Sequence, residues 1–317
     1  MKSFLSLALK KLFHKRLNRF LSKRHYLIIF RNGSAIGDHV YLSSIIAKIH
    51  NQNNKKIILF TNYFDLFLNN PKIYKLFKFK ANSIIWFFLE SLKSDSILEF
   101  HSIHATYENH YIKKKYFLFF HKKKKIHLGQ AMSSHFNLDI DYKNLKNEFF
   151  FSKKELKEYE DELELPLNFS LIQSTSKTSF TKNKEWKLER MQSIVDHFSE
   201  INWIQIGLSS EPRLKNCIYK LDLDLRKLAF VIFKCDFLVT YEGLFNHLAS
   251  SFNKKNFLIH TGFLPIEAFN YSNNIVIEAN SKMKCYPCYD IHCESHTEDC
   301  LKNLTVDLVI NKIKNNL

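Results

Sequence analysis

The chain has 317 residues, of which 45% are hydrophobic, so it is long enough to bury the cores of two α/β domains of ordinary size. This composition excludes a disordered chain, and the lack of an uncharged apolar run of about eighteen residues excludes a membrane-spanning helix by the usual length criterion. A formal net charge of +16 favours an acidic partner such as nucleic acid, anionic lipid or phosphorylated glycan, although an AT-rich genome would give the same abundance of Lys.

Residues 1–24 form a basic segment without a single acidic side chain. Its apolar residues recur at spacings of three and four, which predicts an amphipathic helix. Such a helix can lie in the interface of an anionic membrane, where each basic side chain near the surface contributes about 1 kcal/mol. The alternative is a terminal helix that packs on the following domain and keeps its basic face in water.

The same segment does not resemble a signal peptide, because its apolar part is short, interrupted by charge and not followed by a small-residue cleavage site. We therefore expect a reduced, cytoplasmic setting for the six cysteines. Together with the basic helix, this predicts a protein bound peripherally to the inner face of the cytoplasmic membrane.

Residues 26–44 hold the first chemical motif. Residues 26–30 are apolar and predict a buried parallel strand, after which Gly33 and Gly37 permit a tight turn into a helix near Asp38. In open α/β sheets, ligands bind at the carboxyl ends of strands, so Asp38 is a candidate catalytic carboxylate. The loop lacks the Lys and Ser/Thr of a P-loop and the third glycine of a dinucleotide fingerprint, so it is not a standard nucleotide cradle.

Further strands are predicted at residues 56–61, 76–79 and 96–101, with helical intervals between them. This alternation is typical of a parallel sheet with crossover helices. His101 lies near the carboxyl end of the fourth strand, where it can contact a ligand or serve as an ordinary polar loop residue. Lysine runs at 113–115 and 122–125 predict a basic surface, which either meets phosphate groups of a ligand or is simply solvated.

A charged stretch at residues 152–166 ends in a proline and marks the connection between two halves. Strands are then predicted at 169–173, 202–206, 237–240, 256–260 and 274–278. The predicted fold class is α/β, with two Rossmann-like doubly wound domains at residues 25–155 and 156–317 that face each other across a cleft.

The second half carries features suited to a nucleotide diphosphate. A loop rich in Ser, Thr and Lys follows the strand at 169–173, and its hydroxyls, backbone amides and Lys184 can bind phosphate oxygens. The strand at 237–240 runs into a turn with Glu242 and Gly243, followed by His247 in a helix. A helix N-terminus beside a carboxylate suits a sugar diphosphate, and His247 can donate to phosphate or be a structural histidine.

Four cysteines gather near the C-terminus, at positions 285, 288, 293 and 300. Compact spacing of Cys285, Cys288, Cys293 and Cys300 is compatible with structural zinc. Packed reduced thiols or a redox-sensitive pair are the alternatives.

These motifs, in this order, resemble glycosyltransferase family 9, the bacterial heptosyltransferases of lipopolysaccharide core assembly. Arg31, Gly33, Ala35, Gly37 and Asp38 fit the family's first loop. Lys184 and Trp186 fit its Lys-x-Trp motif, and the interval from Glu242 to His247 matches its acid-to-histidine spacing before Leu-Ala. Gln173-Ser174 replaces the family's Pro-Gly, and Glu242 replaces its aspartate.

The resemblance implies a glycosyltransferase B fold and an inverting, metal-independent transfer, with the acceptor on the N-terminal domain and the donor on the C-terminal one. It implies ADP-heptose as donor, a lipopolysaccharide or lipooligosaccharide core as the anionic glycolipid acceptor, and no cofactor. On chemical grounds we expect Asp38 to act as the general base, and we expect Arg31 and His101 to bind the acceptor. The implied donor-binding residues are Ser174, Thr175, Lys184, Glu242, Gly243 and His247. A related transferase using another nucleotide sugar, or a non-enzymatic binder of anionic lipid or nucleic acid, is the alternative.

Overall fold

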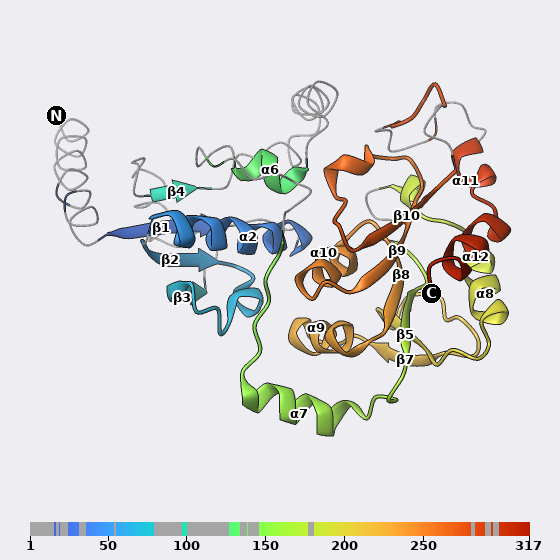
Figure 1. Ribbon diagram of the computed structural model, residues 1–317, viewed down its shortest axis with the longest axis horizontal. Helices are drawn as coiled ribbons and strands as arrows, with labels where there is room; N and C mark the ends of the chain where they lie inside the picture. The colour runs from blue at the N-terminus through green and yellow to red at the C-terminus, as the bar shows by residue number, and fades with distance from the viewer. Residues whose placement is uncertain are drawn as a thin grey trace. The chain divides into compact units, whose positions relative to one another are not determined.

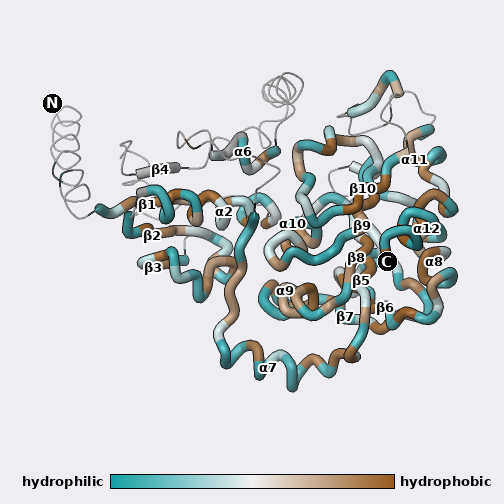
Figure 2. The backbone as a smooth tube through the Cα atoms, in the orientation of Figure 1, coloured by the Kyte–Doolittle hydropathy of each residue, from teal (hydrophilic) through white to brown (hydrophobic). Residues whose placement is uncertain are grey.

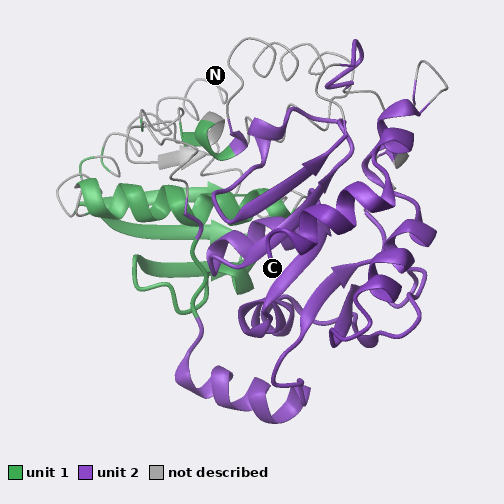
Figure 3. Cartoon of the chain, turned by 45° about the vertical axis from the view of Figure 1, so that its right-hand side comes forward, with its two compact units in different colours: residues 1–117, 129–140, 148–150 green, residues 118–128, 141–147, 151–317 purple. Residues whose placement is uncertain are grey.

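The computed structural model describes residues 16, 19, 25–31, 36–53, 55–78, 97–99, 127–133, 138, 146–176, 181–279, 283–288, 293 and 298–317. The chain divides into two compact units (Figure 3). The first comprises residues 1–117, 129–140 and 148–150, and the second comprises residues 118–128, 141–147 and 151–317. The predicted boundary between residues 155 and 156 falls inside helix α7 (Lys153–Leu163), which lies wholly in the second unit. No helix in the described ranges is long and apolar enough to cross a membrane.

The first unit is built on a parallel sheet with the strand order β3-β2-β1-β4 (Figure 1). Its strands are β1 (Tyr26–Arg31), β2 (Lys56–Thr61), β3 (Ile73–Lys78) and β4 (Ile97–Glu99). Helix α2 (Ile36–Asn53) connects β1 to β2, and the short 3-10 helix η1 (Phe64–Phe67) precedes β3. The alternation of strand and helix predicted for this half is therefore confirmed where the chain is described.

Strand β1 is central in this sheet, which explains its continuous apolar sequence. It pairs with β2 on one side and β4 on the other, and every residue from Leu27 to Arg31 is buried. A parallel strand that is covered on both faces has no polar alternation. Helix α2 contributes buried apolar side chains, including Val40, Leu42, Ile45, Ile46 and Ile49.

The second unit has a six-stranded parallel sheet with the order β10-β9-β8-β5-β6-β7. Its strands are β5 (Ser170–Gln173), β6 (Trp203–Gly207), β7 (Ile218–Leu221), β8 (Phe237–Tyr241), β9 (Lys255–His260) and β10 (Asn274–Glu278). Five of these were predicted within one or two residues. The edge strand β7 was not, because Ile218 and Tyr219 are exposed and the strand has no apolar pattern.

Three helices connect strands of the second unit: α8 (Leu188–His197), α9 (Leu225–Lys234) and α10 (Leu244–Ser251). Two more, α11 (Asp299–Asn303) and α12 (Val306–Lys314), follow the last strand, β10. Shorter elements are η4 (Lys182–Lys184), η5 (Ile266–Ala268) and α6 (Leu128–Ser133), the last of which spans the boundary of the two units in sequence.

A large apolar cluster holds the second unit together. Trp186, Met191 and Ile194 pack with Trp203, Val239 and other strand residues, all of them buried. Hydrophobic residues, brown in Figure 2, lie along strands of this unit such as β5 and β8.

The order of the strands creates a reversal in the sheet. From β5 the chain proceeds outward through β6 to β7, whereas β8 lies on the other side of β5 and is followed outward by β9 and β10. The direction in which strands are added to the sheet therefore reverses between the neighbouring parallel strands β5 and β8.

Candidate functional site

The carboxyl ends of β5 and β8 form the topological switch point of the second unit, where ligands of doubly wound sheets bind. The two ends are joined directly. Gln173, the last residue of β5, accepts a hydrogen bond at Oε1 from the backbone N–H of Tyr241 at 3.2 Å. Its Nε2 donates to the carbonyl of Thr175 at 2.6 Å. One side chain thus fixes the loop after β5 against the end of β8.

Lys184 and Glu242 lie together at this switch point. The Lys184 Nζ is 3.0 Å from the Glu242 Oε1, and the two side chains are only 17% and 16% exposed. The same ammonium lies 4.9 Å from the ring centroid of Phe263, which follows β9. The predicted phosphate-binding lysine and the predicted acid of the turn after β8, which are 58 residues apart in sequence, are therefore direct partners.

Hydrogen bonds from three parts of the second unit hold the residues on either side of Lys184. The Thr261 hydroxyl donates to the carbonyl of Asn183 at 2.6 Å, and the Tyr241 hydroxyl donates to the carbonyl of Trp186 at 3.0 Å. The indole N–H of Trp186 donates to the carbonyl of Leu304 at 2.7 Å. Strands β8 and β9 and the C-terminal region therefore position Lys184, and the family-like tryptophan serves as its buried anchor.

Gly243 is the N-cap of α10 and has φ of 152° and ψ of −158°. A residue with a side chain rarely adopts this conformation, so glycine is needed here for the backbone path and not for space: a Cβ would meet nothing within 4 Å. Because no side chain in the described part of the chain caps α10, the N–H groups of its first turn and its dipole can interact with an anion.

His247 lies one turn into α10 and is 4% exposed. Its Nδ1 is 2.9 Å from the hydroxyl of Tyr271, whose ring meets the imidazole edge-on. A histidine oriented through one nitrogen by a second residue can present its other nitrogen to a ligand. Both predicted interpretations, phosphate donor and satisfied structural histidine, are compatible with this contact.

Ser174 and Thr175 follow β5 as predicted, and both side chains are buried and hydrogen-bonded within the second unit, Thr175 to Glu211. Ser174 is fully buried, and its hydroxyl accepts a hydrogen bond from Gln205 Nε2 at 2.9 Å. Thr175 is 8% exposed. The Ser174 hydroxyl is thus engaged in the core, whereas the loop backbone remains the part that can approach a diphosphate. The donor-binding role of both residues stays a prediction.

Glu211 is a candidate site residue that the sequence analysis did not single out. It follows β6, whose last residue Gly207 has φ of 146°; a Cβ at Gly207 would lie 2.2 Å from the Glu211 Oε2. Burial raises the pKa of Glu211, the charges of Glu185 and Asp222 act in the same direction, and hydrogen bonds from Leu208 and Thr175 oppose them. The sequence feature that could have pointed to this position is Gly207, one of only six glycines, at the end of a predicted strand.

In the first unit, Asp38 lies in the first turn of α2. Its Oδ2 is 3.9 Å from the Nη2 of Arg31, which is the last residue of β1 and is fully buried. Burial lowers the pKa of Arg31, while Asp38 and Tyr63 oppose that shift. The predicted carboxylate and the predicted arginine therefore form an ion pair at the carboxyl end of β1.

Three further residues lie at this edge of the first sheet: His39 in α2, and Asn62 and Tyr63 after β2. His39 Nε2 is 3.1 Å from Asn62 Oδ1, and the His39 ring meets Tyr63 edge-on at 4.6 Å between centroids. Burial raises the pKa of Tyr63, an effect opposed by Arg31. Asn62 and Tyr63, which follow β2, thus lie at the same edge of the sheet as Asp38. The sequence analysis did not predict these two residues, because it considered only the loop after the first strand. Gly33 and the predicted acceptor residue His101 lie outside the described residues.

The Cys285 side chain is exposed, whereas Cys288, Cys293 and Cys300 are half-buried. The Cys288 N–H donates to the carbonyl of Gly262 at 3.1 Å, and burial raises the pKa of Cys300. Among the described residues, no group of three His, Cys, Asp or Glu side chains could hold a metal ion. The zinc alternative stays a prediction.

Neither a protein-family model nor a curated protein matches the sequence. A glycosyl transferase family 9 protein from Veillonella parvula is similar in structure, with a TM-score of 0.64, 14% identity, and coverage of 92% of this chain and 96% of that chain. The iron-containing dodecameric glycosyltransferase TibC from enterotoxigenic E. coli gives 0.64 at 13% identity, covering 92% and 76%. The ADP-heptose lps heptosyltransferase II of E. coli gives 0.58 at 10%, covering 91% and 98%.

Likeness at such low identity is evidence about the fold. Two parallel-sheet α/β units, with the motifs in family order, confirm the α/β class and the glycosyltransferase B type predicted from the sequence. The chain has the fold of the family 9 glycosyltransferases and heptosyltransferases.

Proposed function

We propose that this protein is a glycosyltransferase that takes a sugar from a nucleotide-sugar donor. The observation that carries the proposal is the position of Lys184 at the switch point of the second unit, beside Glu242 and the uncapped start of α10. A fixed cation and free backbone N–H groups are the groups that stabilise a diphosphate as a leaving group.

The donor we propose is ADP-heptose. Among the solved structures of similar fold, TibC has been seen in complex with ADP-D-beta-D-heptose, and E. coli heptosyltransferase WaaC with ADP. In this chain Lys184, the first turn of α10 and His247 would bind the diphosphate, and Glu242 would accept hydrogen bonds from sugar hydroxyls. Ser174 and Thr175 would contribute through the loop that contains them.

Asp38 is the proposed general base. It would remove the proton of an acceptor hydroxyl while that oxygen forms a bond to the anomeric carbon, and the bond from that carbon to the nucleotide diphosphate breaks with its electron pair leaving on the diphosphate. Attack from the face opposite the leaving group inverts the configuration. The buried guanidinium of Arg31 lies 3.9 Å from the Asp38 carboxylate, and the ionised carboxylate is the form that a general base requires.

The acceptor we propose is an anionic glycolipid of the lipopolysaccharide or lipooligosaccharide core, met at the inner face of the cytoplasmic membrane. The support is the net charge of +16 and the basic character of residues 1–24. Arg31 and His101 remain the proposed acceptor-side residues, with Arg31 acting through Asp38.

A related transferase with another sugar donor is the second candidate, and a specific observation favours it. Glu242 stands where the family has aspartate, so the carboxylate at the sugar end of the site is displaced by one methylene. The position of that carboxylate decides which sugar hydroxyls it can reach.

Calorimetric titration with a panel of nucleotide sugars tests the proposal, with a random oligonucleotide as the control for charge alone. We expect ADP-heptose to bind and the oligonucleotide not to compete with it. Mass spectrometry of the glycolipid from a deletion strain should then show a core that lacks one sugar. Oligonucleotide binding with no affinity for any nucleotide sugar would overturn the proposal.

A further inference from the structure

The Lys184 ammonium already has a carboxylate of its own chain as a partner. Glu242 lies 3.0 Å from it, and both side chains are largely withdrawn from water. Phe263 covers the ammonium from the strand β9 side. An ion pair with so little exposure is screened less than a surface pair. Any diphosphate that is to use Lys184 has to compete with Glu242.

Glu242 is also held so that it cannot move far from the competing anion. It stands between Tyr241, whose backbone N–H is bound by Gln173, and Gly243, the N-cap of α10. The buried side chain of Tyr241 is anchored through its hydroxyl on the carbonyl of Trp186. A carboxylate whose backbone is fixed at the start of α10 remains close to a diphosphate bound there and repels it.

This inference rests on the proposed function. We infer that Glu242 couples recognition of the sugar to recognition of the diphosphate, so that the site selects a complete nucleotide-sugar donor over the bare nucleoside diphosphate left after transfer. A bare diphosphate disrupts the ion pair and leaves the carboxylate beside an anion. A donor with a sugar supplies hydroxyl groups that donate to the displaced carboxylate and offset this cost.

The length of the Glu242 side chain matters to this coupling. Glu242 directly follows β8, Lys184 is the last residue of η4, and their side chains form an ion pair at the carboxyl edge of the sheet. An aspartate at position 242 keeps the charge but is shorter by one methylene. The Glu242→Asp variant should therefore retain the repulsion while weakening the ion pair.

The test is calorimetric titration of ADP and ADP-heptose into the wild-type chain, Glu242→Gln, Lys184→Met and the double variant. We expect Glu242→Gln to bind ADP about three- to tenfold more tightly, the size of one weakly screened charge interaction, and ADP-heptose no more tightly than wild type. The preference for donor over ADP should therefore fall. In the Lys184→Met background, Glu242→Gln should improve ADP binding less, because no ion pair remains to be broken.

Glu200→Gln is the matched control. Glu200 is exposed and lies shortly before the amino end of β6, at the opposite edge of the sheet, and its substitution makes the same change in net charge. It should leave both affinities unchanged, and thermal unfolding should show each variant folded.

Two failures are distinguishable. If ADP and ADP-heptose bind the wild-type chain but Glu242→Gln binds ADP equally or more weakly, the coupling is overturned and the proposed function stands. If no nucleotide sugar or nucleoside diphosphate binds any variant, both are overturned.

Discussion

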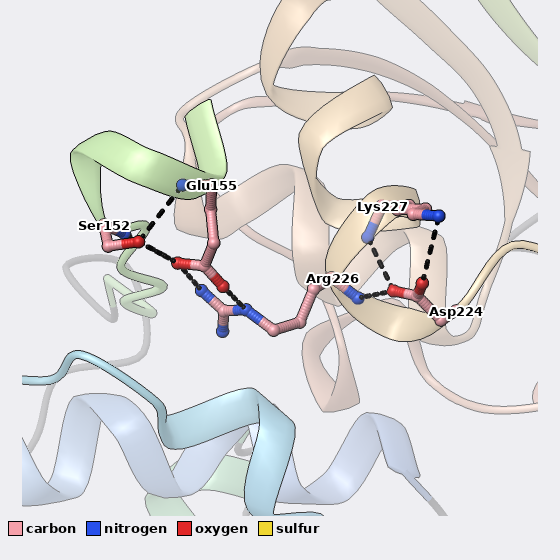
Figure 4. Close-up of polar contacts among 5 residues, drawn as sticks. All are labelled: Ser152, Glu155, Asp224, Arg226 and Lys227. Carbon is pink, nitrogen blue, oxygen red and sulfur yellow. Dashed lines mark hydrogen bonds and ion pairs between the residues drawn. The ribbon is translucent and has the colours of Figure 1, made fainter. Parts of the chain in front are cut away.

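Arg226 binds the carboxylate of Glu155 through two nitrogens on one edge of its guanidinium: Nη2 donates to Oε2 at 3.1 Å, and Nε donates to Oε1 (Figure 4). The same carboxylate accepts from the backbone N–H of Ser152 at 2.7 Å, which closes a capping box at the start of α7. Arg226 lies in the first turn of α9, so the pair joins two helices. The side chains are 6% and 17% exposed, and the ring of Phe151 lies 5.4 Å from the guanidinium.

Glu155→Ala should destabilise the second unit by about 2–4 kcal/mol, because it removes the capping box and the carboxylate that faces a buried guanidinium. Urea unfolding followed by tryptophan fluorescence measures this, since Trp186 and Trp203 are buried in that unit. Glu162→Gln is the control: its pair with Lys227 joins the same helices but is far more exposed, so its effect should stay within about 0.5 kcal/mol. Equal losses of unfolding free energy for the two substitutions would contradict a special stabilising role of the Glu155–Arg226 pair.

The stabilisation by Glu155 should depend on pH. Burial favours a higher pKa for this carboxyl, but hydrogen bonds from Arg226 and Ser152 outweigh burial and lower the pKa from its ordinary value of 4.5. A carboxyl with a lowered pKa in the folded state stabilises fully above its unfolded pKa and loses that contribution as the pH falls through the folded value. The difference in unfolding free energy between wild type and Glu155→Gln should therefore be constant near neutral pH and shrink below about pH 4.5. A difference that grows on acidification would refute this.

Asp38→Asn should keep ADP-heptose affinity and lose about 10²- to 10⁴-fold in the rate of transfer, because asparagine cannot take up the acceptor proton. Single-turnover transfer to isolated glycolipid measures the rate, and calorimetry measures donor affinity. Asp65→Asn, an exposed acid of the same unit, should leave both unchanged. Full transfer activity in Asp38→Asn would remove this residue from the mechanism.

Gly243→Ala should weaken ADP binding and destabilise the second unit by about 1–3 kcal/mol, because alanine is strained at a φ of 152°. There is room for the methyl group, so the effect is conformational and not steric. Calorimetry and thermal unfolding report the two quantities. Ser251→Ala, at the other end of α10, is the control and should leave ADP affinity intact.

Treatment with EDTA should leave transfer activity unchanged. Lys184 and the start of α10 supply positive charge for the leaving diphosphate, so the proposed chemistry requires no divalent cation. The measurement is the initial transfer rate before and after dialysis against chelator, with metal content determined in parallel. A loss of activity that added magnesium or manganese restores would show that the proposed role of Lys184 is incomplete.

Part of this architecture could be predicted because it is encoded locally. Apolar runs separated by helical stretches indicate parallel strands whichever partners they have, so β1, β2, β5, β8 and β10 were visible in the sequence. Gly243 could be singled out for a similar reason, since a scarce glycine at the end of a strand marks a backbone path that other residues rarely adopt. Edge strand β7 lacked such a pattern.

The sequence by itself determined the α/β class, the chain order of the motifs and the candidacy of Asp38 and Lys184. Only the tertiary structure decided what these residues contact: that Lys184 is paired with Glu242, that Arg31 is buried behind Asp38, and that Glu211 lies over Gly207. The physical reason is that periodicity and turn chemistry act between near neighbours in the chain. The order of strands in a parallel sheet, by contrast, brings loop ends together across dozens of residues, and burial then sets which charges meet.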